Sequence, residues 1–449
     1  MGKIKEKIKN FKKITNTLFS KFPVTLIIIL LTTIIVGFTI GSEICDSIYF
    51  SKVLIFLVTF GIGTFFIETK FREKKNIIFY YVVVGVISGI FTYLLNDDIN
   101  SFIFKLYVCY IFSIIAMSIY FIYKGSNVSF EKYITNIAVN IFKFSIVYGL
   151  LSIGLFLISL VFIFLILNVT KTSFIVNIQI LVLGLFYIPS ILYSLCTIVE
   201  IKSKFIKAII KNVLDILIIV AFAIIYLYIA KIIILRNMPS NQIYRITAVL
   251  FTIGLPIWTM SIYLNEDNLI DKINGKLPVL FIPFIFLQIY TISIRIINYG
   301  LTEARYLCVI FVVFEAIYIT LYLTAREKIY KIIPISVILI VISLIVPVIN
   351  MNDLSKISQV NNLKLIQKNE DLNDEEISKI IGAYEYLNKA DISKNVITQN
   401  EINKIQEYIN DRDNKYISKS EYKILNYKSN ETDLNIEGYK RISNISVRN

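Results

Sequence analysis

A chain of 449 residues with 56% hydrophobic and only 17% charged residues has more apolar surface than a soluble fold of that length needs, which indicates an integral membrane protein. Histidine is absent, so mechanisms that need an imidazole base, a histidine nucleophile or a histidine-bound metal or haem are excluded for this chain. The four cysteines show no CxxC spacing, so we expect neither a disulfide framework nor a thiolate metal site.

Apolar runs of the length that a bilayer requires recur along most of the chain. After a basic N-terminal segment, 1–22, we expect eleven transmembrane helices between residues 23 and 350. They lie near 23–41, 48–67, 77–95, 104–123, 144–167, 175–199, 212–234, 244–264, 278–295, 305–324 and 331–350. Residues 351–449 are expected to form a separate soluble domain, so the predicted fold is an all-α polytopic membrane protein with a small extracytoplasmic C-terminal α(+β) domain.

Lysine and arginine are distributed unevenly between alternate loops. If the N-terminus is cytoplasmic, every loop on its side of the membrane is basic, whereas the first and third outer segments carry acidic residues. This positive-inside pattern predicts a cytoplasmic N-terminus, and an odd number of spans then places the C-terminal domain outside. The net charge of +14 is thereby explained by topology and by anionic lipid head groups, without a nucleic-acid partner.

Three local patterns bear on helix packing. Ser129–Phe142 has apolar residues at helical spacing, which predicts either an interfacial helix or a plain extension of the fifth span. Gly85 and Gly89 form a GxxxG pattern that permits close helix approach. Prolines fall inside spans of the second half only, so we find no inverted repeat of the kind that many transporters contain.

The composition becomes rich in Asn, Lys, Asp, Glu and Ser after Asn350. Asn373 is expected to cap a helix that begins at Asp374 and carries one apolar stripe. A second helix is expected over Asn400–Ile409, and the alternation over Thr432–Val447 resembles a strand pair.

Glu315 is the most unusual single residue, because it lies ten residues after Arg305 and therefore about 15 Å along the tenth span. An ionised carboxylate near the bilayer midplane costs about 2.5–3.5 kcal/mol even on lenient insertion scales. It is either a proton or cation site, or a neutral acid that hydrogen-bonds to a neighbouring span through Tyr290 or Thr291. With Arg305 and Arg295 it makes up the candidate intramembrane polar site.

A second candidate is an outer anion site. Basic groups on the outer side run against the positive-inside rule, so another interaction must favour them. Convergent helix ends would form a basic vestibule for a phosphate or carboxylate, whereas independent side chains would only reach to the interface. The members proposed for this site are Lys105, Lys231 and Arg245, beside Lys52, Arg295 and Arg305.

The turn between the ninth and tenth spans can be explained by helix capping, with Gly300 as a C-cap and Thr302 as an N-cap. The run Tyr299-Gly-Leu-Thr-Glu-Ala-Arg-Tyr306 also resembles the GLTxxRY segment of the bacterial membrane family catalogued as domain of unknown function 4153. Lys21-Phe22-Pro23 before the first span and Ile357-Ser358-Gln359 after the last agree with it. The resemblance covers nearly the whole chain and implies a multi-span bacterial envelope protein, with no activity attached.

Three functions are compatible with these features. A permease or flippase for an anionic small molecule or lipid predicts a water-accessible cavity that reaches Glu315. A non-enzymatic envelope sensor or scaffold predicts a tightly packed bundle and a groove on residues 351–449. A glycosyltransferase-like enzyme acting on lipid-linked sugars is less favoured, and its candidate base and metal ligands are Glu43, Asp46, Asp97 and Asp98.

Motifs for nucleotide and hydrolase chemistry are absent, since the chain has no GxxxxGK[ST], GxGxxG, HExxH or GxSxG sequence. A non-enzyme without a cofactor is therefore favoured, with the lipid bilayer and an anionic ligand or lipid head group as its partners. The bias toward Ile, Lys and Asn resembles that of an AT-rich bacterium, which predicts the bacterial plasma membrane.

Overall fold

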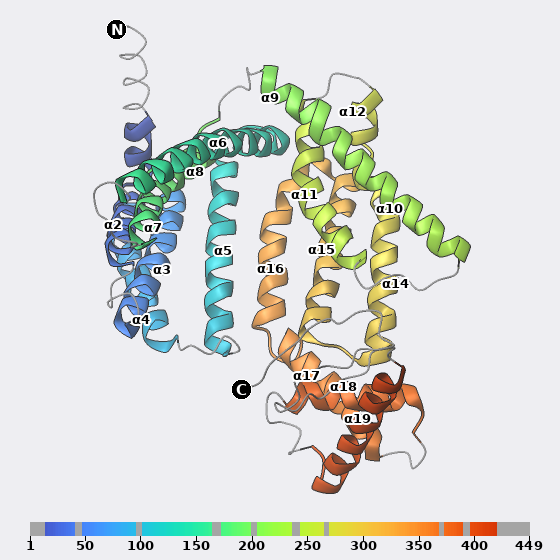
Figure 1. Ribbon diagram of the computed structural model, residues 1–449. Helices are drawn as coiled ribbons and strands as arrows, with labels where there is room; N and C mark the ends of the chain where they lie inside the picture. Colours follow the sequence, from blue (N-terminus) through green and yellow to red (C-terminus); the bar gives the residue numbers. More distant parts are fainter. Residues whose placement is uncertain are drawn as a thin grey trace, which may run out of the picture. The chain divides into compact units, whose positions relative to one another are not determined.

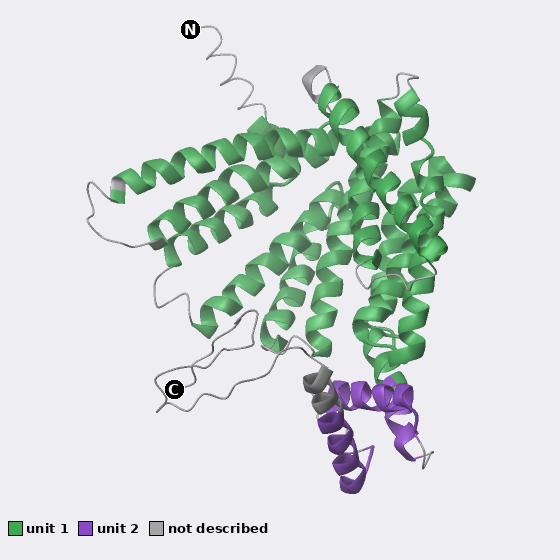
Figure 2. Ribbon diagram, turned by 45° about the vertical axis from the view of Figure 1, so that its right-hand side comes forward, with its two compact units in different colours: residues 1–358 green, residues 359–449 purple. Residues whose placement is uncertain are grey.

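The computed structural model describes residues 14–40, 47–95, 101–163, 172–198, 204–235, 243–264, 269–367, 372–388 and 396–419 (Figure 1). Helices make up most of these residues, turns, bends and short irregular stretches connect them, and no strand occurs among them. The chain divides into two compact units, Met1–Ser358 and Gln359–Asn449, which Figure 2 colours separately. This boundary falls inside α17 (Met351–Leu363), eight residues after the expected end of the membrane region at 350.

Nine helices in the described ranges are long and apolar enough to cross a membrane, so the structure supports a multi-pass membrane protein. They are α3 (Ile48–Lys70), α4 (Ile77–Leu94), α5 (Phe102–Lys124), α6 (Phe130–Phe162), the run of α7 (Thr172–Val182), η2 (Leu183–Tyr187) and α8 (Ile188–Cys196), the run of α9 (Lys204–Ile209), η3 (Ile210–Leu214) and α10 (Asp215–Leu235), α11 (Ile243–Tyr263), the run of α13 (Leu277–Leu280) and α14 (Ile282–Tyr299), and α15 (Glu303–Thr324). A tenth span is added if Ile14–Lys21 and α2 (Pro23–Thr39) are counted together, although they are bent by 106°.

The structure does not confirm the expected eleventh span, because α16 (Ile332–Leu344) has only 13 helical residues. At 1.5 Å per residue these extend about 20 Å, which is less than the thickness of a hydrocarbon core of about 30 Å. A 3-10 helix, η4 (Arg326–Lys331), precedes α16, and turns follow it where the sequence predicts the end of a longer helix. Even so, α16 packs alongside α5 and α15, both of which are spanning helices (Figure 1).

The bend before α2 has a specific cause. Pro23 has no N–H, and the next two backbone amides, of Val24 and Thr25, donate to the Glu68 carboxylate at 2.7 and 3.2 Å. The hydroxyls of Thr25 and Tyr81 donate to the same carboxylate at 2.6 and 3.2 Å. Glu68 is only 3% exposed, so a buried carboxylate of α3 caps the positive end of α2.

The segment from Ser129 onward is one continuous helix, α6, of 33 residues. The structure therefore agrees with the extension of the fifth span rather than with a separate interfacial helix. Ser129 is its N-cap, since the hydroxyl accepts a hydrogen bond from the backbone amide of Lys132 at 3.3 Å.

Close helix approach occurs at other glycines than the GxxxG pattern predicts. A Cβ at Gly89 would meet no described atom within 4 Å, and one at Gly85 would make only an ordinary contact. At Gly184, in the π-helix η2, a Cβ would lie 1.8 Å from the Thr33 hydroxyl of α2, and at Gly63 it would lie 2.3 Å from Val84 of α4. The tight contacts therefore fall on α2–η2 and α3–α4, so the prediction for Gly85 and Gly89 was wrong within the described bundle.

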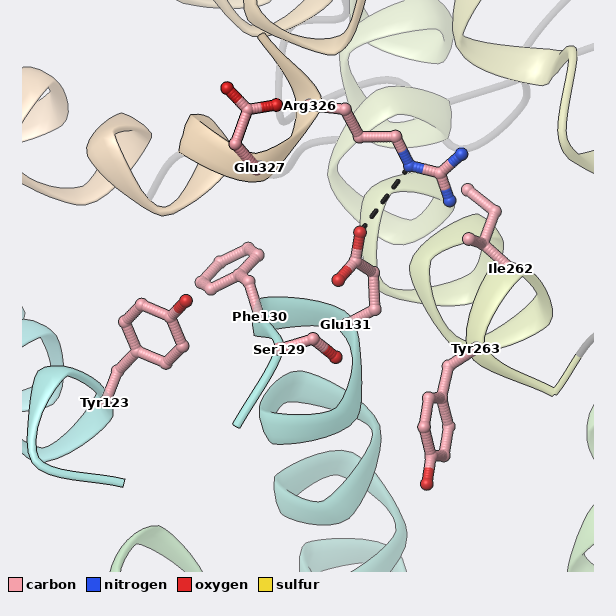
Figure 3. Close-up of a pocket in the computed structure, with 8 residues that line it drawn as sticks. All are labelled: Tyr123, Ser129, Phe130, Glu131, Ile262, Tyr263, Arg326 and Glu327. Carbon is pink, nitrogen blue, oxygen red and sulfur yellow. Dashed lines mark ion pairs between the residues drawn. The ribbon is translucent and has the colours of Figure 1, made fainter. Parts of the chain in front are cut away.

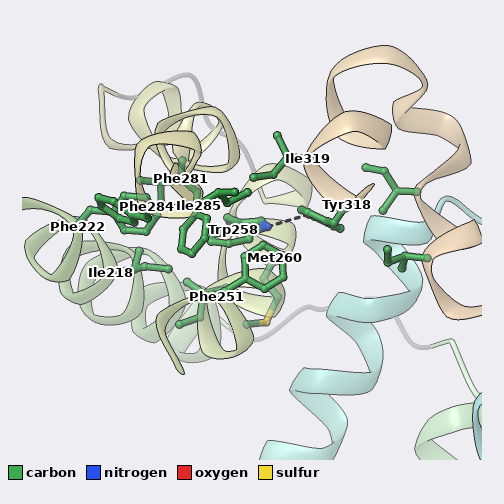
Figure 4. Close-up of a cluster of buried hydrophobic side chains, with 14 of the residues drawn as sticks. Ile218, Phe222, Phe251, Trp258, Met260, Phe281, Phe284, Ile285, Tyr318 and Ile319 are labelled. Carbon is green, nitrogen blue, oxygen red and sulfur yellow. Dashed lines mark hydrogen bonds between the residues drawn. The ribbon is translucent and has the colours of Figure 1, made fainter. Parts of the chain in front are cut away.

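The second half of unit 1 has an aromatic core (Figure 4). The Phe251 ring lies 5.1 Å from the Phe281 ring and 5.6 Å from those of Trp258 and Tyr318. The Trp258 indole, which is fully buried, donates to the Tyr318 hydroxyl at 2.8 Å. Rings from α11, the α13–α14 junction and α15 thus fix these helices against one another.

Unit 2 has its own small core. The helices η5 (Lys364–Gln367), α18 (Asp374–Asn388) and α19 (Gln399–Lys419) surround buried residues that include Leu363, Ile380 and Ile405. The predicted cap is confirmed, because Asn373 and Glu376 exchange backbone-to-side-chain hydrogen bonds at 3.1 and 2.9 Å. The expected strand pair at 432–447 lies outside the described residues.

Candidate functional site

Glu315 is fully buried in α15, facing α14. Its partner is Gln288, also fully buried, whose amide nitrogen donates to Glu315 Oε1 at 3.4 Å. The two partners expected from the sequence do not play this part, since Tyr290 is 54% exposed and the Thr291 hydroxyl donates to its own helix at Leu287. Glu315 Oε2 and Gln288 Oε1 have no hydrogen-bond donor within the described part of the chain.

Arg305 has a local structural role. Its Nη1 atom donates to the backbone oxygens of Gly300 and Tyr299 at 2.5 and 3.3 Å, and so caps the last carbonyls of α14. Gly300 ends the helix with φ 74°, as expected for a glycine C-cap, whereas Thr302 stands at the N-cap without a side-chain hydrogen bond. Arg305 does not contact Glu315 among the described hydrogen bonds and ion pairs, and it lies about three helical turns away.

Three arginines from three spans lie within electrostatic range of one thiol. Arg245 of α11, Arg295 of α14 and Arg305 of α15 all act electrostatically on the thiol of Cys308. Arg295 and Arg305 also act on each other, which places two like charges close together. Arg245 is near the start of α11, Arg295 is near the end of α14, and Arg305 is near the start of α15, so the last two flank the α14–α15 turn. This set is called the arginine cluster below.

The two lysines of the predicted outer site are placed differently. Lys105 is in α5, which α16 separates from α15, so it does not join the arginine cluster (Figure 1). Its side chain is only 6% exposed, and its Nζ has no hydrogen-bond partner among the described residues. Lys231, near the end of α10, is exposed. Of the basic groups proposed from the sequence, Arg245, Arg295 and Arg305 therefore lie near one another, and Lys105 and Lys231 do not join them.

A second buried polar group lies at the other end of α11. Lys211 in η3 forms an ion pair of 2.8 Å with Asp271 in α12 (Leu269–Asn274). Asp215, the first residue of α10, is fully buried and accepts a hydrogen bond from the Ser261 hydroxyl of α11 at 2.9 Å. Asn274 of α12 donates to Ser261 at 3.1 Å. These five residues are called the aspartate centre below.

Sequence reasoning missed the aspartate centre. It gave no site role to Lys211 or to Asp215, which lies four residues later. A lysine and an aspartate at i and i+4 share one helix face, and that spacing inside an apolar run was the available signal. Asp271, Ser261 and Asn274 come from other elements, so no local pattern could have joined them.

An open pocket of about 520 Å³ lies at the end of α11 (Figure 3). The ends of α5, α6, α11 and η4 line it, and an ion pair of 3.5 Å between Arg326 and Glu131 crosses it. Two of its lining residues, Ile262 and Tyr263, follow Ser261 directly in α11. The volume falls in the range of small-molecule sites.

The segments that carry the family resemblance have structural roles. The Leu301 amide donates to the Ser358 hydroxyl at 2.8 Å, so two of the quoted segments meet. Lys21, from the third, donates to the Cys196 carbonyl at the end of α8 at 3.1 Å. The acids proposed for a glycosyltransferase, Glu43, Asp46, Asp97 and Asp98, all lie outside the described residues.

Comparison with protein-family models, curated proteins and solved structures finds no match to the chain.

Proposed function

We propose that the chain is a permease or flippase-like protein of the bacterial plasma membrane that handles an anionic small molecule or lipid head group. The multi-pass helical structure supports a membrane function. The observation that carries the proposal is the arginine cluster, in which cationic groups from three spans act on one point. Like charges within electrostatic range of one another favour an anionic ligand, because arginine can bind a phosphate or carboxylate with two parallel hydrogen bonds.

The proposed topology follows the positive-inside rule. The N-terminus is cytoplasmic, α16 with its flanking turns crosses as an eleventh span, and the C-terminal unit is extracytoplasmic. The arginine cluster then faces the outside, while the aspartate centre and its pocket face the cytoplasm. The resemblance to the family of unknown function 4153 agrees with this envelope location.

Native Cys308 provides a direct probe of the arginine cluster, because its side chain is partly accessible. In a variant whose other three cysteines are serine, we expect a sulfonate-bearing thiosulfonate reagent to label Cys308 about tenfold or more faster than a trimethylammonium reagent. Inorganic phosphate or vesicles of anionic lipid should slow the labelling, and the two probes separate a free anion from a lipid head group. Labelling of intact cells from outside tests the topology.

Arg245→Gln and Arg295→Gln should each reduce the preference for the anionic reagent. Lys231→Gln is the matched control, because it removes an exposed basic residue that does not act on Cys308. Equal rates for the two reagents, with no protection by either anion, would contradict an anion site.

The second candidate is a non-enzymatic envelope sensor or scaffold. It is favoured by unit 2, which is a separate compact unit with its own hydrophobic core, and by the dense packing around Glu315. The two candidates differ in whether water ever reaches Glu315. The glycosyltransferase-like enzyme has no support from the described residues.

A further inference from the structure

Two acceptor oxygens of the aspartate centre have no hydrogen-bond donor among the described residues. Asp215 Oδ2 accepts from Ser261, but Asp215 Oδ1 has no donor among the described residues. Asn274 lies within hydrogen-bonding reach of the same carboxyl, and its own Oδ1 is also without a donor. Both side chains are fully buried. Two buried oxygens of adjacent side chains therefore lack a hydrogen, and each such atom is costly to leave without a partner.

The charge of the centre is also unbalanced. The charged groups that act on Asp215 are Lys211 from η3 and Asp271 from α12, while Ser261 and Asn274 are neutral. Lys211 forms its ion pair with Asp271 at 2.8 Å. With both carboxyls ionised, the described charged groups that meet here would be one cation and two anions, in a setting that disfavours uncompensated charge.

We propose that Asp215 is a proton-binding site, with the proton on Oδ1 and with Ser261, Asn274 and the Lys211–Asp271 ion pair as its fixed surroundings. A single proton neutralises the surplus charge and supplies the donor that the centre lacks. The acid's carbonyl oxygen is then Oδ2, which already accepts from the Ser261 hydroxyl at 2.9 Å. One bound proton therefore accounts for both the surplus negative charge and the missing hydrogen-bond donor.

Two features near Asp215 along the chain bear on how a proton would reach it. The residue follows the π-helix η3 directly, and π-helical turns leave backbone groups out of the regular ladder. The open pocket is lined by Ile262 and Tyr263, which follow Ser261 in α11. If the chain is the proposed permease, this site gives it a proton as coupling ion, and that last step alone rests on the proposed function.

Infrared spectroscopy of the full chain in lipid nanodiscs tests the proton directly. At neutral pH the carbonyl-stretch band of a protonated carboxylic acid should lose one component in Asp215→Asn. Ser261→Ala should shift that component to higher frequency, because it removes the hydrogen bond to Oδ2 and leaves Asp215 in place. Glu315→Gln is the matched control for the other fully buried acid and should leave the Asp215 component unchanged.

Ser261→Ala keeps the test decisive if Asp215→Asn does not fold. No neutral-pH component that responds to Asp215→Asn or Ser261→Ala would overturn the proposal. Disappearance of the component when sodium or potassium is added would also overturn it, since the site would then bind a metal cation. Neither result depends on whether the chain transports anything, so failure of the proton site is distinct from failure of the permease.

Discussion

Replacing Glu68 with alanine should destabilise the protein through the N-terminus of α2. The substitution leaves the backbone amides of Val24 and Thr25 without their acceptor. Glu68 is only 3% exposed, so water does not readily replace its carboxylate. An unsatisfied buried donor costs about 1–3 kcal/mol, so the two together predict a loss of about 2–6 kcal/mol in the free energy of unfolding. Reversible unfolding in mixed detergent and SDS micelles measures this quantity.

Two further variants make the result specific. Thr25→Val removes one of the four donors to the carboxylate and should cost less than Glu68→Ala. Thr32→Val is the matched control, because the Thr32 hydroxyl donates only within its own helix, at 2.8 Å to Ile28. If Glu68→Ala unfolds at the same SDS fraction as wild type, or if Thr32→Val costs as much, the carboxylate does not cap α2.

Other substitutions test other parts of the structure. Lys211→Met should lower the free energy of unfolding by about 3–5 kcal/mol, because it removes the cation that pairs with the buried Asp271. Adding Asp271→Leu should restore most of this loss, whereas additive losses would contradict a coupled pair. Gly184→Ala should cost about 1–3 kcal/mol by overpacking, whereas Gly89→Ala enters open space and should cost nothing; equal effects would refute the packing described. Desolvation raises the pKa of Glu401, but hydrogen bonds at the start of α19 outweigh it and hold the pKa below its usual 4.5. The stabilisation that ionised Glu401 gives to the folded state is therefore complete above the unfolded-state pKa, and it is lost as the pH falls through the folded-state pKa. Hydrogen exchange in the first turn of α19, corrected for intrinsic rates, should rise below about pH 4.5 in wild type and show no such step in Glu401→Gln.

The membrane class and the position of most spans could be predicted from the sequence, because a bilayer demands long apolar runs that are visible in any window. The ends of the helices could not. The pattern at 331–350 predicts one long helix, yet the structure makes only 13 α-helical residues and then turns from it, directly after a 3-10 helix that ends at Lys331. Hydropathy measures how apolar a segment is, and it does not register where the backbone leaves the helix.

The candidate site shows the same limit. Glu315 was identifiable because one acid in an apolar run is conspicuous, but its partner Gln288 was not, since pairing depends on how two helices rotate against each other. The aspartate centre could not be predicted for the same reason, because four elements, η3, α10, α11 and α12, contribute its residues. Arg305 looked like part of a ligand site and also caps α14, which a sequence pattern alone does not reveal.

Cysteine accessibility at position 315 tests most directly whether the helical bundle is a permease. The native cysteines are replaced by serine, and Glu315→Cys is introduced. Intact cells and inverted vesicles that carry this variant are then treated with a small charged thiol reagent. Glu315 is fully buried here, so a permease predicts slow labelling from at least one side, at a rate that an anionic ligand changes as the bundle opens. No labelling from either side, in a preparation where a protein carrying only Cys308 is labelled, would contradict transport and favour the sensor or scaffold.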